Sequence, residues 1–229
     1  RAALRQLTAN KPLFLLLASG VLCFGQMMIQ VGGAVVATVV FGDVRYFTVL
    51  GAALIGGMLV ATLTTPRLLR HTTRRRMMQV ILAGLAASYL LLYAVGFTSV
   101  ALVAGAIAVN GLFLGAYSVT QTMMIGDTAN YVEALTGDRI DGACFAGLTF
   151  VTKLNSALAT MVFGLVVAWV GYQSDAPVSG GMRSGIWLSL TLLPAASVLL
   201  GLLPLRAYAV PERDLPALLA ARRAEAAAR

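Results

Sequence analysis

Six long runs of apolar residues, separated by short polar segments, account for most of the chain. A helix needs roughly 20 mostly apolar residues to cross the hydrocarbon core of a bilayer. The pattern therefore predicts an all-α membrane protein in which six transmembrane helices form one bundle over residues 12–205. The expected spans are 12–41, 47–69, 77–96, 98–126, 142–171 and 185–205.

The flanking segments are polar and are expected to lie outside the bilayer. Residues 1–11 are interpreted as a cytoplasmic lead-in, and residues 206–229 as a cytoplasmic tail that forms either a short helix or a frayed end. The first eleven residues are polar, and the apolar run that follows is too long for the apolar region of a signal peptide. The chain begins with Arg1 rather than Met, which suggests a piece of a longer protein or a trimmed one.

Composition supports the membrane class. Hydrophobic residues make up 59% of the 229 residues and charged residues 11%, whereas a soluble domain is about a quarter charged. Mean hydropathy is +0.85. A soluble fold of this composition would have to cover its surface with apolar side chains, and a bilayer removes that difficulty.

The basic residues predict the orientation of the spans. With the N-terminus on the inner side, the inner segments hold 14 of the 17 basic residues, the outer loops hold Arg45 and Arg183, and Lys153 stands within a span. Such an excess of Lys and Arg is typical of cytoplasmic loops. Both ends of the segment are therefore expected in the cytoplasm. The net charge of +8 reflects this topology, and nucleic acid is not an expected partner.

Lys153 lies inside the fifth apolar run, about eleven residues from its inner end. At a rise of 1.5 Å per residue this is roughly 16 Å into the helix. A charge at the centre of a bilayer costs roughly 2.5–3.5 kcal/mol even on the lenient insertion scale, so such residues face a bundle interior or an aqueous cavity. The alternative is a neutral or structurally paired lysine. No acidic residue of this chain lies in a span at the same depth.

Other polar residues within the spans extend this picture. Some recur at helical spacing on one face, which suits helices that line a wet cavity, although hydrogen bonds between helices are the structural alternative. The candidate substrate-binding and coupling residues are Lys153, Thr149, Thr152, Gln26, Gln30, Asn110, Tyr117 and Gln121.

The segment Gly126–Lys153, "GDTANYVEALTGDRIDGACFAGLTFVTK", carries a family pattern. It presents Asp127, Tyr131, Glu133 and Arg139 at fixed spacing before Lys153, and a basic loop "PRLLRHTTRRRMM" precedes it in the chain. This resembles the glycoside–pentoside–hexuronide:cation symporters, the melibiose-permease-like branch of the major facilitator superfamily. The resemblance covers nearly the whole chain. It implies that the six spans are helices seven to twelve, the C-terminal half of a twelve-helix transporter whose partner is an N-terminal six-helix bundle.

The resemblance also implies roles for individual residues. Lys153 matches a lysine that faces the central cavity and is tied to solute and cation coupling. A second group matches the cytoplasmic gate, in which acidic residues pair with basic residues when the inner side is closed. Its candidates are Asp127, Glu133, Arg139 and Asp141, with Arg67, Arg70, Arg74, Arg75 and Arg76 as possible partners. The sequence departs from the family pattern at Asn130, Val132 and Ala134, so the gate is expected to be retuned and the solute need not be a sugar.

The expected function is therefore that of half a symporter for a glycoside or other small polar solute, working by alternating access in the plasma (inner) membrane. The coupling ion, Na⁺ or H⁺, would be bound mainly by the N-terminal half, and neither a cofactor nor a metal site is expected. The alternative is a non-transporting membrane scaffold, or a truncated remnant that binds a partner bundle. An enzyme is not expected, because no catalytic motif is found and His71 is the only histidine.

Overall fold

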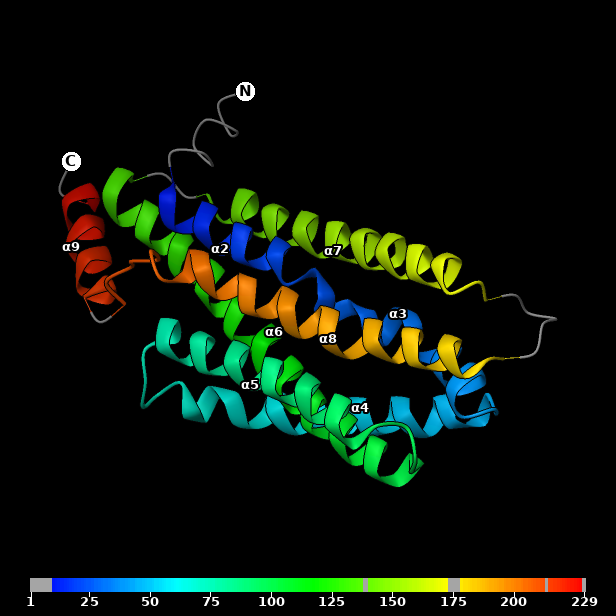
Figure 1. Ribbon diagram of the computed structural model, residues 1–229. Helices are drawn as coiled ribbons and strands as arrows, with labels where there is room; N and C mark the ends of the chain where they lie inside the picture. Colours follow the sequence, from blue (N-terminus) through cyan, green and yellow to red (C-terminus); the bar gives the residue numbers. More distant parts are fainter. Residues whose placement is uncertain (1–9, 138–139, 173–177, 213, 228–229) are drawn as a thin grey trace.

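The computed structural model describes residues 10–137, 140–172, 178–212 and 214–227, and these residues form a bundle of long helices (Figure 1). The first apolar run is divided into α2 (Lys11–Leu22), a 3₁₀ turn (Phe24–Met27), α3 (Met28–Val35) and a π-helical turn (Val36–Val40). The elements that follow are α4 (Arg45–Leu68), α5 (Arg74–Val95), α6 (Val100–Thr136), α7 (Asp141–Trp169), α8 (Gly180–Leu205) and α9 (Leu215–Ala227).

The architecture confirms the expected all-α membrane class. Helices α4 to α8 are each long and apolar enough to cross a membrane, and the first run adds a sixth span if its two parts, which meet at a bend of 49°, count as one. The starts of α2, α5 and α7 lie at the same end of the bundle as the ends of α4, α6 and α8 (Figure 1). This up-and-down path gathers the basic segments at that end, called the inner end below.

The bend in the first span is stabilised by α8. Ser197 donates a 2.6 Å hydrogen bond to the carbonyl oxygen of Leu22 and accepts one of 2.9 Å from the backbone N–H of Gly25. A side chain at Gly25 would overlap Pro194 and Ser197 themselves, so only glycine lets the two helices approach this closely. Backbone groups freed by a helix break at membrane depth need such partners. The expected span 12–41 is thus correct in extent but broken in the middle.

The fourth span extends further than expected. Helix α6 continues past Gly126 to Thr136, so most of the segment between the expected spans 98–126 and 142–171 is helix rather than loop. Residues 127–136 contain neither glycine nor proline, and nothing in them ends a helix. Gly137 ends it instead, in a left-handed conformation with a φ of 81° that favours glycine.

Glycines hold α4 and α6 together. A Cβ atom at Gly57 would overlap the backbone at Ala108, and one at Gly111 would overlap the backbone at Leu54. Both helices therefore pack backbone to backbone, as small residues allow in membranes. Gly56 and Gly105, on the same two helices, have open space where a Cβ would stand.

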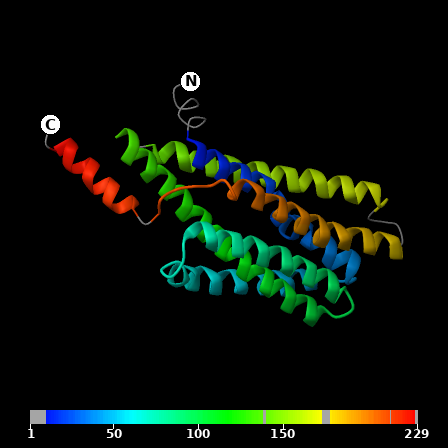
Figure 2. The same ribbon diagram turned by 60° about the vertical axis from the view of Figure 1, so that its left-hand side comes forward.

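The tail ends in a helix, which matches the first of the two expectations for it. Helix α9 lies beside the inner end of α6 and extends beyond the bundle (Figure 2). The side chain of Arg222 on α9 donates to the carbonyl oxygen of Thr136, at 3.4 Å. The tail therefore contacts the inner end of α6, where the predicted gate residues begin.

Candidate solute cavity and inner polar cluster

A polar cavity of about 250 Å³ lies between the first span, α6 and α7. Three helices contribute amide, phenol and hydroxyl groups to it, and its position next to the bend in the first span is where a discontinuous helix exposes polar backbone in transporters. Ser118 and Asn155 add two polar side chains to it, and Met27 of the 3₁₀ turn also lies in its wall. Five of the predicted residues line it: Gln26, Gln30, Tyr117, Gln121 and Thr152.

Hydrogen bonds fix two sides of this cavity. The side-chain amide of Gln121 donates to the Tyr117 hydroxyl at 2.9 Å, which orients both groups on α6. On α7, Asn155 donates from Nδ2 to the carbonyl oxygen of Gly20 at 2.9 Å. The other amide atom of Asn155, Oδ1, is buried and has no hydrogen-bond partner in the described part of the chain. The cavity thus holds a buried acceptor that is free to bind a donor, such as a solute hydroxyl.

Lys153 and Thr149 lie outside this cavity, on the exposed face of α7. Ser156 and Thr160 share that face, at spacings of four, three and four residues along Thr149, Lys153, Ser156 and Thr160. The hydroxyls of Thr149 and Thr160 donate to backbone carbonyls of their own helix. The resulting polar stripe, called the α7 stripe below, runs along a helix that is otherwise apolar.

Asn110 has a different environment from the other candidates. It is fully buried between α5 and α6, where its amide nitrogen donates to the Ser88 hydroxyl at 2.9 Å. It is not among the residues that line the polar cavity. The alternative considered for such residues, a hydrogen bond between helices, describes its place in the fold.

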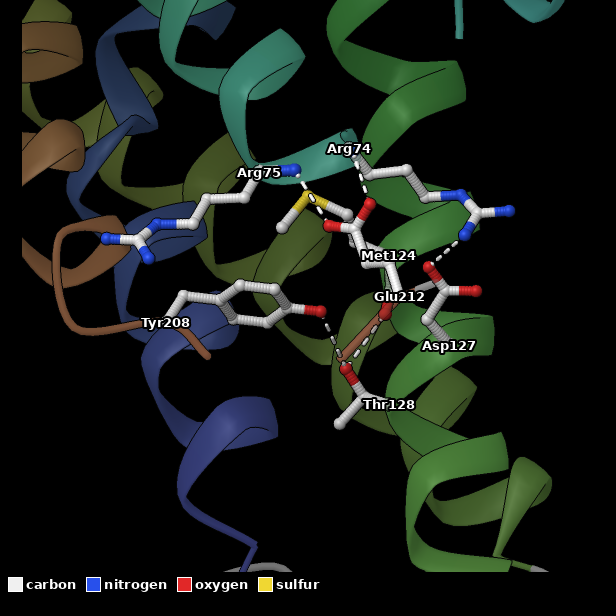
Figure 3. Close-up of polar contacts among 7 residues, drawn as sticks. All are labelled: Arg74, Arg75, Met124, Asp127, Thr128, Tyr208 and Glu212. Carbon is white, nitrogen blue, oxygen red and sulfur yellow. Dashed lines mark hydrogen bonds and ion pairs between the residues drawn. The ribbon is translucent and has the colours of Figure 1, made fainter. Parts of the chain in front are cut away.

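An ion pair joins α5 and α6 at the inner end. The Nη1 atom of Arg74 lies 2.5 Å from Oδ2 of Asp127, as Figure 3 shows. The Asp127 side chain is 9% exposed, whereas that of Arg74 is 34% exposed. The carboxylate is therefore largely shielded from water, while the arginine remains in contact with it.

The segment between α8 and α9 adds a second acid to this cluster. Glu212 accepts hydrogen bonds from the backbone N–H groups of Arg74 and Arg75, at 2.6 and 3.0 Å (Figure 3). These N–H groups begin α5 and have no partner within that helix, so a carboxylate satisfies them and also interacts favourably with the helix dipole. A second contact joins α5 to the same segment, because the Arg75 side chain donates a hydrogen bond to the carbonyl oxygen of Arg206 at 2.5 Å.

A buried tyrosine completes the cluster. Tyr208 is fully buried, and its hydroxyl lies 3.5 Å from that of Thr128 on α6. Burial raises the pKa of the Tyr208 phenol, which keeps the group neutral and able to donate a hydrogen bond. Sequence reasoning did not single out Glu212, Tyr208 or Thr128. The run "PERD" in the tail was the one available signal, and it does not say which helix the acid reaches.

The remaining predicted gate residues lie around the same end. Glu133 is buried near the end of α6, Asp141 begins α7, and Arg67 and Arg70 are exposed at the end of α4. Arg139 lies outside the described residues. Among the described residues, no group of three or more His, Cys, Asp or Glu side chains is placed to hold a metal ion.

Comparison with known proteins agrees with these features. A family model described as MFS/sugar transport protein matches residues 1–212. The glucuronide carrier protein homolog of Escherichia coli K12 is 25% identical over 215 residues, which cover 92% of this chain and 47% of that protein. The putative 2,3-dihydroxypropane-1-sulfonate exporter of Salmonella typhimurium LT2 is 26% identical over 196 residues, which cover 83% of this chain and 41% of that protein.

A third relative matches a shorter stretch of the chain, and its name describes it as a cation symporter. The putative glycoside/cation symporter YagG of Escherichia coli K12 is 34% identical over 74 residues, or 31% of this chain and 16% of that protein. These findings confirm the family predicted from Gly126–Lys153 and the integral membrane class. The chain spans about half the length of the curated relatives that match most of it, which agrees with the expected half of a transporter.

Proposed function

Since this chain belongs to the family of MFS/sugar transport proteins, we propose that it is the C-terminal half of a cation-coupled secondary transporter that carries a small hydroxylated solute without converting it chemically. Transport would follow alternating access, in which two six-helix bundles rock around a site between them. Na⁺ or H⁺ would drive it and would be bound mainly by the N-terminal half.

The α7 stripe is the observation that carries this proposal. A lysine and three hydroxyl residues are exposed on one face of a membrane helix, where lipid contact would be costly. Of the most apolar part of α4 and of α7, 22% is buried inside the bundle, against 44–56% for α5, α6 and α8. The face that bears the stripe therefore suits a water-filled space shared with a second bundle, and Lys153 suits a role inside it.

Lys153 also favours a particular chemistry for the solute. The names of two relatives, a glucuronide carrier protein homolog and a putative 2,3-dihydroxypropane-1-sulfonate exporter, contain solutes that combine hydroxyl groups with an acid group. A lysine would pair with such an acid group, and the amide and phenol groups of the polar cavity would bind the hydroxyls. We therefore propose a hydroxylated organic acid as the solute.

The inner cluster would serve as the gate on the cytoplasmic side. The excess of basic residues at the inner end supports placing it in the cytoplasm. The arginine of this pair is 34% exposed, so water can replace its partner when the contact breaks, which suits contacts that break and reform in each cycle. The gate would include Asp127 and Arg74, which are in contact, and Glu133, Asp141, Arg67, Arg70, Arg75 and Arg139 as further members.

Uptake by the full-length transporter in proteoliposomes tests the proposal. Phenyl β-D-glucuronide and the neutral phenyl β-D-glucoside would be compared under an imposed Na⁺ or H⁺ gradient. We expect gradient-driven uptake of the glucuronide. Lys153→Met should reduce it about tenfold to hundredfold, the range of a hydrogen bond to a charged group, and Lys11→Met makes the same change at the exposed start of α2 as a control.

The outcomes separate the parts of the proposal. Uptake that depends on neither the Na⁺ gradient nor the H⁺ gradient would contradict cation coupling. Equal uptake by wild type and Lys153→Met would contradict the role of Lys153, and equal uptake of both sugars would contradict the preference for an acid. If the purified protein assembled with a second bundle but bound neither sugar, the alternative of a non-transporting scaffold would be favoured.

A further inference from the structure

A second cavity, of about 280 Å³, adjoins the polar one on the side toward the outer end of the bundle. Its walls come from α3, α4 and α8, with contributions from α5 and α6, and they are almost wholly apolar. The residues that matter here are Gly51, Leu54 and Ile55 on α4, and Trp187 and Leu190 on α8. An apolar cavity of about 150 Å³ in another protein is large enough to bind benzene.

The two cavities share part of their walls. Gln30 and Met58 line both of them, so the exposed amide of Gln30 stands at the junction between a polar and an apolar compartment. A molecule that reached from one to the other would meet amide, phenol and hydroxyl groups at one end and aliphatic and aromatic side chains at the other.

Trp187, in the wall of this cavity, carries a buried polar group. The residue is 4% exposed, and its indole N–H has no hydrogen-bond partner among the described residues. A buried donor usually has a partner, and interiors seldom leave voids much larger than a water molecule. A ring packed in this space, with an acceptor near the indole, would fill the void and satisfy the donor.

We propose that the apolar cavity between α3, α4 and α8 binds an apolar arm of the transported solute, either aryl or alkyl, while the hydroxylated head occupies the polar cavity. The proposal rests on the transport function proposed above and narrows its solute to amphipathic molecules. The walls shared at Gln30 and Met58 favour the solute over a lipid chain, because they place the apolar cavity directly beside the amide, phenol and hydroxyl groups proposed to bind the head of the solute.

Binding of two probes with the same head tests this inference. Methyl β-D-glucuronide and phenyl β-D-glucuronide would be titrated into the full-length transporter in nanodiscs. Burying a phenyl ring should make the Kd of the phenyl compound about tenfold to hundredfold lower than that of the methyl compound. Equal Kd values for the two would overturn the inference and leave the transport function standing.

Two glycines of α4 provide a matched pair of variants. Gly51 lines the apolar cavity and Gly56 does not, and a Cβ atom at either meets no other atom within 4 Å. Gly51→Phe should raise the Kd of the phenyl compound to that of the methyl compound, while Gly56→Phe should preserve the difference. Ile55→Trp fills the same cavity from an exposed position and serves if Gly51→Phe does not fold.

Each result decides the matter. If both cavity-filling variants still bound the phenyl compound more tightly than the methyl compound, the inference would be overturned. It would also be overturned if the wild type preferred the phenyl compound in detergent but not in a bilayer, since lipid would then occupy the cavity. If neither glucuronide bound to the wild type, the proposed solute class would fail and this inference with it.

Discussion

The side chain of Asn155 on α7 donates a 2.9 Å hydrogen bond to the backbone carbonyl of Gly20 on α2. Gly20 lies in the last turn of α2, and its carbonyl oxygen also accepts a hydrogen bond of 3.1 Å from the backbone N–H of Cys23. The same asparagine lines the polar cavity with an unpartnered Oδ1 atom. One residue therefore both stabilises the break in the first span and offers an acceptor to the solute.

Asn155→Leu should lower both stability and solute affinity. The substitution keeps the number and branching of the side-chain heavy atoms. It removes one of two donors to the Gly20 carbonyl, the other being the backbone N–H of Cys23, and the loss of such a hydrogen bond costs about 0.5–1.5 kcal/mol. It also removes the free acceptor from the cavity. Thermal unfolding and solute titration of the purified transporter would measure the two effects, with the exposed Ala157→Leu on the same helix as a control. If the melting temperatures of both variants matched that of wild type, this hydrogen bond would have no structural role.

The contact between α4 and α6 predicts a strong dependence on which glycine is changed. Gly57→Ala and Gly111→Ala should each destabilise the protein by about 1–3 kcal/mol, the range for overpacking, because the added methyl group would overlap backbone of the facing helix. Gly56→Ala and Gly105→Ala add the same atom in open space and should have little effect. The midpoint of thermal aggregation in detergent measures this, and four equal midpoints would contradict the packing described here.

The sequence predicted the features that depend on one helix at a time. The six spans follow from runs of apolar residues, and the common face of Thr149 and Lys153 follows from their spacing of four residues on a single helix. Gln26, Gln30, Tyr117 and Gln121 line one cavity, and their spacing of four residues places each pair on one face of its own helix. Local periodicity is sufficient for inferences of this kind.

Features that depend on contacts between distant segments were missed. Glu212 reaches the start of α5 from 138 residues away along the chain, and nothing near it in sequence indicates that target. Asn110 was grouped with Tyr117 because they are seven residues apart, but Ser88 on the neighbouring helix holds its amide. The end of α6 was placed ten residues early, because charge was interpreted as the edge of the span although helices continue into water until a residue such as Gly137 ends them.

The Arg74–Asp127 pair should respond unequally to the loss of its two members. Arg74→Gln removes the arginine of the pair and leaves a carboxylate that is largely shielded from water. Asp127→Asn removes the carboxylate and leaves an arginine that still contacts water. Leaving a buried charge unpaired costs more than removing it. We therefore expect Arg74→Gln to lower the melting temperature more than Asp127→Asn does. A double-mutant cycle would isolate the coupling between them, and the reverse order of the two single variants would contradict the burial on which the argument depends.

Glu212 should anchor the tail to the inner end of the bundle. Glu212→Ala removes both acceptors from the first N–H groups of α5, and losses of this kind cost about 0.5–2 kcal/mol. The segment 206–212 should then become more accessible to protease, because only the burial of Tyr208 and the Arg75–Arg206 contact would remain, among the contacts described above, to hold it against the bundle. Limited proteolysis followed by mass spectrometry measures this, with Asp214→Ala, an exposed acid two residues further along, as a control. Equal cleavage of the two variants would mean that Glu212 does not anchor the tail, and that burial of Tyr208 is sufficient to do so.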